Sequence, residues 1–314
     1  MNLLKVIITG ISGDIGKSIS KILKKRIKNI CIVGVDIKPD VSNLVYGDNF
    51  YQLPSVKDES YYIQLKRIIT LEQPNIIIPT SEDEIYYFTD NEIHSILGAL
   101  VLVTRGEISK VGRDKWLTIL KLQKSGIEVP STEILQDADY EGGRHIIKSR
   151  RGAGSKNICI IENELDFNYY KVKYPNWIIQ EYLSSEKDEY TCCIYKDDEI
   201  EKYFILNREL IGGRTGKGKI VNDSEIIDYL QKISNLFDFT GSINIQLRLT
   251  EKGPRIFEIN PRFSSTVFMR DLLGFQDLIW SLNNLITLPN KTNYSLEQID
   301  GKLVSIEDDV RIYE

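Results

Sequence analysis

The sequence predicts an α/β protein in two parts. The first is an N-terminal domain with a parallel, doubly wound sheet, and the second is a larger α+β domain built from antiparallel strand pairs. Three observations predict this. Apolar, β-prone runs alternate with helical patterns over the first hundred residues. A glycine-rich turn follows the first of these runs directly. From about Gly112 onward, the apolar runs instead come in pairs joined by turns.

The N-terminal alternation can be followed element by element. Short apolar runs bounded by turn residues are typical of buried strands, and longer segments with apolar residues three or four apart are typical of helices. Helical connections between successive strands favour a parallel sheet, with ligands at the carboxyl ends of its strands. The expected helices are Gly16 to Ile27, Ser60 to Thr70 and Glu82 to Ile96. The expected strands are Lys5 to Thr9, Ile30 to Asp36, Asn75 to Pro79 and Leu100 to Thr104.

The second part begins with a helix from Asp114 to Lys124, with Asp114 as its N-cap and Gly126 beyond its end. A further helix is expected from Ser224 to Phe237, and the tail after Pro289 offers one strand, Lys302 to Ile306. The remaining apolar runs predict strands at Ile146 to Lys148, Ile158 to Ile161, Trp177 to Tyr182, Glu189 to Tyr195 and Gly241 to Leu249.

Composition excludes several classes of protein. The chain has 314 residues, 42% of them hydrophobic and 27% charged, as in ordinary globular proteins. A net charge of −5 argues against broad binding to nucleic acids or anionic membranes. No apolar run approaches the roughly 18 residues that span a bilayer. The first apolar run leads straight into the glycine turn, so we expect no signal peptide and a cytoplasmic protein. Two histidines are too few for a multi-histidine metal site.

The most informative segment is a predicted hairpin near residue 252. Glu258 and Asn260 are two apart in a β-prone run, so their side chains share one face of a strand. If the hairpin is centred on Lys252, Gln246 lies opposite Glu258 on that face. Carboxylate and amide oxygens suit a hard cation such as Mg²⁺. Arg262, just beyond the strand, would add a planar donor fork for a phosphate.

This hairpin resembles the metal-binding strands of the ATP-grasp superfamily, with the branch containing the large subunit of carbamoyl phosphate synthase as the nearest likeness. The resemblance implies a Rossmann-like pre-ATP-grasp domain followed by a two-lobed ATP-grasp domain. It also implies that Gln246, Glu258 and Asn260 hold Mg²⁺ or Mn²⁺ on the phosphates of ATP. Arg262 would contact the phosphate in transfer.

Two further segments of the sequence match phosphate-binding positions of the superfamily. Lys115, directly after the N-cap, matches a basic residue on the nucleotide phosphates. Lys148 ends a strand before a basic, glycine-rich loop that contains Gly152 and Ser155. Backbone N–H groups of such a loop can contact phosphates while the lysine neutralises charge. The order of lysine and glycines is the reverse of that in a Walker-type P-loop.

The adenosine part of ATP is expected to bind along the strand that contains Gln180 and Glu181. The resemblance implies that Glu181 meets the adenine amino group and that the backbone at Leu183 contacts the ring edge. Glu189 matches a carboxylate on the ribose hydroxyls and is preferred to Glu186, because it begins the next apolar strand. Arg208 matches an arginine beside the substrate, before a glycine turn.

The N-terminal glycine turn supports a rival hypothesis. Gly10, Gly13 and Gly16 fit a pattern of NAD(P)-dependent reductases and epimerases, and Asp36 closes the second strand where it could meet a ribose. A Tyr-x-x-x-Lys pair, Tyr169 and Lys173, also exists, but in a polar stretch rather than an amphipathic helix. An intermediate interpretation has the turn facing an acceptor substrate, together with the segment from Pro79 to Glu82.

The expected function is ATP-dependent ligation of a small carboxylate to an amine through an acyl phosphate, with release of ADP and phosphate. The expected domains are 1–112 and 113–314, with a lid lobe over about 115–182 and a metal-binding lobe over about 183–289. Three alternatives remain: a bicarbonate-using half of a carbamoyl phosphate synthase, the nicotinamide enzyme, and a non-catalytic ATP-binding regulator. A homodimer is suggested only by analogy with such ligases.

Overall fold

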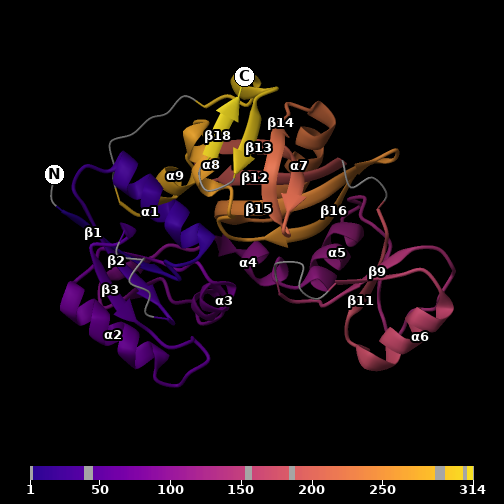
Figure 1. The fold of residues 1–314 in the computed structure, drawn as a ribbon, viewed down its shortest axis with the longest axis horizontal. Coiled ribbons are helices and arrows are strands. Elements are labelled where there is room, and N and C mark those ends of the chain that lie inside the picture. Colours follow the sequence, from indigo (N-terminus) through magenta and orange to yellow (C-terminus); the bar gives the residue numbers. More distant parts are fainter. Residues whose placement is uncertain are drawn as a thin grey trace.

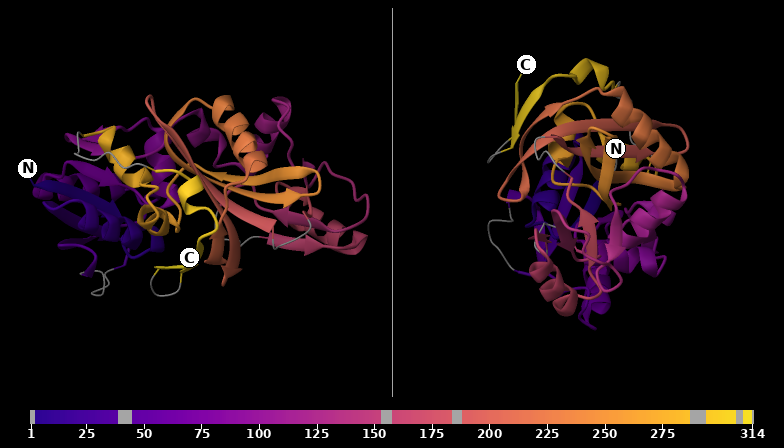
Figure 2. Two further views of the ribbon diagram at one scale, coloured as in Figure 1. Left: turned by 90° about the horizontal axis from the view of Figure 1, so that it is seen from above. Right: turned by 90° about the vertical axis from the view of Figure 1, so that its right-hand side faces the viewer.

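The computed structural model describes residues 3–38, 45–152, 158–183, 188–286, 294–306 and 310–313. Three parts lie in a row along the long axis of the molecule (Figures 1 and 2). A parallel α/β domain is at one end, a large antiparallel sheet is in the middle, and a small α+β lobe is at the other end. The predicted fold class is confirmed. Among the described residues, no helix is both long enough and apolar enough to cross a membrane.

The N-terminal sheet has six strands in the order β3-β2-β1-β4-β6-β5. Its neighbours pair in parallel, except that β5 runs antiparallel to β6 at the edge. The helices of this domain are α1 (Asp14–Arg26), α2 (Tyr61–Glu72) and α3 (Glu82–Asp90). The strands are β1 (Leu4–Thr9), β2 (Ile30–Asp36), β3 (Asn49–Gln52), β4 (Ile76–Ile78), β5 (Ser95–Ile96) and β6 (Ala99–Val101).

Two features of this domain differ from the prediction. The helix expected from Glu82 to Ile96 ends at Asp90, because Glu92 adopts a left-handed φ of 53° and the chain then turns into the β5–β6 hairpin. Strand β3 was not predicted, since its sequence Asn-Phe-Tyr-Gln lacks an apolar run. It forms because the open edge of β2 supplies its hydrogen-bonding partner.

The small lobe holds a four-stranded antiparallel sheet in the order β10-β9-β11-β8. Helix α6 (Glu164–Lys173) covers one face through Phe167, its one buried residue. The polar stretch around Tyr169 is therefore helical, although with Phe167 as its one buried residue it lacks the broad apolar face of an amphipathic helix. Its N-cap Asn163 accepts a hydrogen bond from the backbone of Asp166, which offsets the weak apolar pattern. The strands are β8 (Thr132–Ile134), β9 (His145–Lys148), β10 (Ile158–Ile161) and β11 (Ile178–Glu181).

The large sheet runs in the order β16-β15-β12-β13-β14-β17-β18, with β7 added at one end of β15. Helices α4 (Glu107–Val111) and α5 (Lys115–Lys124) connect the two domains, and α7 (Ser224–Leu236) packs on the sheet. The strands are β7 (Arg105–Gly106), β12 (Glu189–Lys196), β13 (Glu201–Ile211), β14 (Arg214–Ile220), β15 (Phe239–Thr250), β16 (Gly253–Asn260), β17 (Leu303–Ile306) and β18 (Val310–Tyr313).

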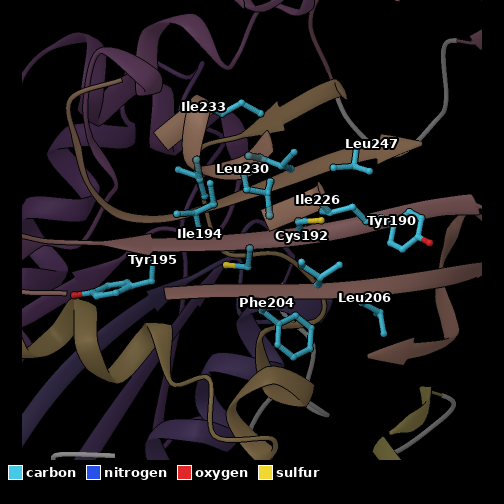
Figure 3. Packing of buried hydrophobic residues seen from close by; sticks show 14 of the residues in the cluster. Tyr190, Cys192, Ile194, Tyr195, Phe204, Leu206, Ile226, Leu230, Ile233 and Leu247 are labelled. Carbon is cyan, nitrogen blue, oxygen red and sulfur yellow. The ribbon is translucent and has the colours of Figure 1, made fainter. Parts of the chain in front are cut away.

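The main core lies between α7 and this sheet (Figure 3). Ile226, Leu230 and Ile233 occupy helical positions i, i+4 and i+7 and are fully buried against the strands. Cys192 and Ile194 on β12 face them from the sheet. This packing fixes the strands whose other face forms the functional cleft.

The chain after β16 returns to the N-terminal domain. Helices α8 (Val267–Leu272) and α9 (Asp277–Asn283) contribute Val267 and Leu278 to the same core cluster as β1 and α1. Arg26 of α1 forms an ion pair with Asp271 at 2.9 Å. The end of β16 at Asn260, and Arg262 two residues beyond it, are therefore held against the N-terminal domain.

Candidate active site

The β15–β16 hairpin has the predicted pairing at its functional end and a different pairing near its turn. Gln246 lies opposite Glu258, as the spacing predicts, and Asn244 lies opposite Asn260. Towards the turn, however, Thr250 pairs with Gly253, so the turn is one residue shorter than a hairpin centred on Lys252 would give. A β-bulge on the Glu258 side of the hairpin restores the register.

The bulge also decides which side chains face the cleft. Ile256 and its partner Leu247 are fully buried in the core, whereas Glu258 and its partner Gln246 line the cleft. In a regular strand, residues 256 and 258 would share a face. The extra residue therefore allows the core and the polar site to use one continuous strand.

One cleft of about 290 Å³ lies between the small lobe and the large sheet. Every predicted site residue that the structure describes lines it, and Ser155 lies outside the described residues. The small lobe and α5 supply one wall, and β12, β13, β15 and β16 supply the other. The predicted residues in the lining are Lys115, Lys148, Gln180, Glu181, Leu183, Glu189, Arg208, Gln246, Glu258, Asn260 and Arg262.

Each predicted metal ligand is in contact with a basic side chain. The Nζ atom of Lys115 lies 3.3 Å from Oε1 of Glu258. Arg208 donates from Nη2 to Oε1 of Gln246 at 3.0 Å. Arg262 donates from Nη2 to Oδ1 of Asn260 at 3.3 Å. Each of the three predicted ligand oxygens thus contacts a basic side chain. A divalent cation bound there would take the place of these three contacts.

The donor set fits a hard divalent cation. It consists of one carboxylate and two amide oxygens, and Mg²⁺ accepts such ligands together with water and phosphate oxygens. Among the described ranges, no group of three or more His, Cys, Asp or Glu side chains offers another metal site. A cation here would therefore depend on Glu258 for charge and on a bound phosphate for its remaining ligands.

Lys148 is buried at the base of the cleft. Its Nζ donates to Oε1 of Gln180 at 2.8 Å and to the carbonyl oxygen of Phe257 at 3.3 Å. Gln180 in turn donates from Nε2 to Oγ1 of Thr132 at 2.8 Å, which orients its amide. Burial lowers the pKa of Lys148 to about 7, with the charges of Lys115 and Arg248 adding to the effect and Glu258 opposing it. A phosphate arriving beside Lys148 would favour the protonated form.

The other end of the cleft contains a closed charge network around Glu189. Arg208 donates to Oε1 of Glu189 at 2.6 Å, and Arg248 donates to Oε2 at 3.0 Å. Arg248 also donates to the carbonyl oxygen of Leu183. Glu186 lies outside the described residues, and Glu189 begins β12 as expected.

Arg248 is a residue that the sequence analysis did not identify. It stands two residues after Gln246 on β15, so strand alternation places both on the cleft face. That spacing is the same signal that identified Glu258 with Asn260. Glu181, at the end of β11, accepts a hydrogen bond from the backbone N–H of Ser131 at 3.2 Å, and its side chain is exposed at the cleft.

The N-cap of α5 is tied to the basic loop of the small lobe. Asp114 accepts hydrogen bonds from the backbone of Trp116 and Leu117, as predicted. Its carboxylate also accepts a hydrogen bond from Nη2 of Arg150 at 2.7 Å. Lys115 donates from Nζ to the carbonyl oxygen of Gly152 at 2.8 Å, so this lysine connects the loop to Glu258.

A second cavity of about 580 Å³ adjoins the cleft on the side of the N-terminal domain. The two share Arg208, Gly213, Gln246, Asn260 and Arg262. The glycine turn and Thr80 line the far wall, so the segments proposed to face an acceptor do border this space. Both oxygens of Asp36 accept backbone hydrogen bonds, from Ser12 at 2.9 Å and Ile37 at 2.7 Å, and the bond from Ser12 connects Asp36 to the glycine turn.

Comparison with known proteins agrees with this geometry. Residues 112–266 match the model of the ATP-grasp domain, and residues 6–97 match that of the PylC-like N-terminal domain. A tyramine–L-glutamate ligase from Methanocaldococcus jannaschii is 20% identical over 253 residues, which cover 79% of this chain and 75% of that protein.

Solved structures share the fold. An N5-carboxyaminoimidazole synthetase from Staphylococcus aureus, in complex with ADP, matches with a TM-score of 0.73 and 16% identity, over 97% of this chain and 83% of that one. An L-amino acid ligase from Bacillus licheniformis matches with a TM-score of 0.70 and 16% identity, over 96% and 79%. With an ATP-grasp domain behind a PylC-like N-terminal domain, the chain belongs to the ATP-grasp superfamily.

Proposed function

We propose that this protein is an ATP-dependent ligase that joins a small carboxylate to an amine through an acyl phosphate. The arrangement of the cleft carries the proposal. One end has a strand edge suited to adenine, and the other has an oxygen ligand set surrounded by basic residues. A second cavity opens directly from the phosphate end. The ligases among the similar proteins support the reaction class.

In the proposed complex, the adenine lies against Glu181 and Leu183, and the ribose lies near Glu189. The phosphates extend towards Lys148, Lys115 and Arg262, whose positive charges offset theirs. A divalent cation held by Gln246, Glu258 and Asn260 would neutralise further charge on the phosphoryl group. The lobe over 115–182 acts as a lid over the nucleotide, behind an N-terminal domain over 1–112.

The reaction then needs two displacements. A carboxylate oxygen of the substrate attacks the γ-phosphorus, the bond from that phosphorus to the bridging oxygen breaks, and ADP leaves. The unprotonated amine then attacks the acyl carbon, phosphate leaves, and the amine releases one proton. Neither step requires a covalent enzyme intermediate. The protein supplies position, positive charge and the exclusion of water that would hydrolyse the acyl phosphate.

The second cavity, here called the acceptor cavity, favours small polar substrates that carry both a positive and a negative charge. Arg208 and Arg262 lie where it meets the nucleotide cleft, and Asp14 and Asp36 lie on its N-terminal wall. A carboxylate beside the arginines and an ammonium group towards the aspartates would match this polarity. Amino acids are therefore the first substrates to test.

The test measures ADP and phosphate release with ATP, Mg²⁺ and pools of amino acids and small carboxylates. The variant Glu258→Gln, which keeps the size of the side chain but removes its charge, serves as the blank. Release that requires one carboxylate and one amine supports the proposal. Release that requires bicarbonate favours the carbamoyl phosphate synthase-like alternative, and ATP binding without turnover in any pool favours the regulator. Failure to bind ATP would overturn all three and leave the nicotinamide hypothesis.

A further inference from the structure

The phosphate-facing arginine is held by a carboxylate from the other domain. Oε1 of Glu82 accepts hydrogen bonds from Arg262 at two guanidinium nitrogens, Nε at 3.0 Å and Nη2 at 2.6 Å. The two residues are 180 positions apart in the chain. Their side chains are 20% and 16% exposed, so the pair is shielded from much of the solvent. Two bonds to one acceptor restrain rotation of the planar guanidinium.

The remaining bonds of Arg262 complete this restraint. Nη2 also donates to Oδ1 of Asn260 at 3.3 Å, and Nη1 donates to the carbonyl oxygen of Phe263 at 3.1 Å. Glu82 is the one acidic partner among these three acceptors. Without it, the guanidinium would keep two neutral contacts at more than 3.0 Å, which are weaker than charge-assisted bonds.

The position of Glu82 is itself fixed by the wall of the acceptor cavity. Glu82 is the first residue of α3, and the N-cap Ser81 accepts from the backbone of Glu84. Thr80 donates to the backbone carbonyl of Thr9 at 2.8 Å, immediately before the glycine turn. Thr80 and Ser81 also line the acceptor cavity. A continuous set of contacts therefore runs from the glycine turn to Arg262.

We propose that Glu82 is a positioning residue that holds the guanidinium of Arg262 in line with the phosphoryl group in transfer. This inference rests on the proposed ligase function. It assigns the N-terminal domain a part in phosphoryl transfer: the wall that borders the acceptor also sets the orientation of the arginine. A misplacement of about 1 Å at such a group can cost about 10²-fold in rate.

The test compares Glu82→Gln with Asp83→Asn. Asp83 is the next residue on α3, but its side chain is 57% exposed and pairs with Lys57 at the surface. We expect Glu82→Gln to lower kcat by about 10²-fold with KM for ATP within about twofold, because the nucleotide contacts stay in place. Glu82→Asp should recover part of the loss. Asp83→Asn should behave as the wild type.

A double-mutant cycle separates positioning from an independent role. If Glu82 acts through Arg262, Glu82→Gln causes no further loss in the Arg262→Ala background. Independent, multiplicative losses would overturn the proposal, as would unchanged kcat in Glu82→Gln. A loss of folding would appear in circular dichroism and would lower the apparent kcat in proportion to the unfolded fraction.

A second readout does not depend on turnover. In ¹⁵N-arginine-labelled protein, the Nε–H proton of Arg262, assigned with the Arg262→Ala variant, should exchange slowly in the wild type and in Asp83→Asn but rapidly in Glu82→Gln. Equal exchange in all three would overturn the proposal. If the wild type releases no ADP with any substrate, the ligase function fails, and the exchange rates still show whether Glu82 restrains Arg262.

Discussion

The two ends of the nucleotide cleft hold their carboxylates in different ways. At the adenosine end, Glu189 is 9% exposed and receives one arginine on each oxygen, at 2.6 and 3.0 Å. At the phosphate end, Glu258 is 16% exposed and, within the described ranges, pairs with one lysine at 3.3 Å. The first carboxylate is an anchor that fixes two strands and two arginines. In the proposed complex, the second would exchange its lysine for a metal ion. Stability and catalysis should therefore respond differently to changes at the two ends.

The largest expected effect is on activity at the phosphate end. Glu258→Gln should lower acceptor-dependent ADP release by at least about 10²-fold, the scale for losing one charge-stabilising group. The melting temperature should change little, since Lys115 keeps its bond to Gly152. Near-normal turnover in this variant would contradict the assignment of Glu258 to the metal.

At the adenosine end, the effect should appear in stability. Glu189→Gln removes the buried carboxylate that pairs with both Arg208 and Arg248, which should lower the free energy of unfolding by about 3 kcal/mol. Urea denaturation would measure this loss. If Glu258→Gln destabilises the protein more than Glu189→Gln does, the contrast between the two ends is wrong.

The pH dependence of stability provides a third comparison, at Lys148. Its folded pKa is about 7 and its ordinary value is 10.5, so the unfolded chain binds more protons between these values. Below pH 7, burial of Lys148 therefore lowers the free energy of unfolding by its full amount. As the pH rises towards 10.5, that free energy recovers by at most about 1.4 kcal/mol per pH unit. Lys148→Met should be more stable than the wild type at pH 6.5, with a smaller margin at pH 9.

Urea denaturation at both pH values measures this margin. The control Lys110→Met removes a lysine whose side chain is 59% exposed and should show no such dependence on pH. A margin that stays constant from pH 6.5 to 9 would mean that Lys148 keeps an ordinary pKa in the folded protein.

The smallest expected effect concerns metal binding without nucleotide. Since a positive charge contacts each ligand oxygen, free Mn²⁺ should bind weakly to the wild type. Lys115→Met removes the charge beside Glu258 and should raise Mn²⁺ affinity about tenfold, or about 1.4 kcal/mol. Electron paramagnetic resonance of Mn²⁺ would measure it. Lys121→Met, at a residue paired with Glu107, is the matched control. Unchanged affinity in Lys115→Met would show that Lys115 does not compete with the metal.

The sequence predicted the features that depend on local spacing. The pairing of Gln246 with Glu258 follows from strand periodicity, and the N-cap at Asp114 follows from residue type. The strands of the N-terminal sheet could be predicted from their apolar, β-branched runs. Such runs occur because the strands of a parallel sheet are buried on both faces.

The features that were missed depend on contacts distant in sequence. Glu82 reaches Arg262 across 180 residues, and no local pattern indicates that contact. Helices α8 and α9 join the core cluster of β1 and α1 through the fold, not through their own periodicity. Strand β3 forms because β2 offers an open edge. Arg248 is the exception, since the alternation that identified Glu258 would also have identified it.

The bulge in the β15–β16 hairpin sets which changes in length this gene can tolerate. Phe257 is the extra residue, because Leu247 pairs with Ile256 and Gln246 pairs with Glu258. A single-codon deletion at Phe257 would make the strand regular and leave Glu258 on the cleft face, between the core-facing Ile256 and Ile259. An insertion between Glu258 and Asn260 would instead put these two side chains on opposite faces. The turn residues Glu251 and Lys252 line neither the cleft nor the second cavity, so their identity is free to vary. Selection on this hairpin therefore acts on the spacing of Glu258 and Asn260 before it acts on the turn.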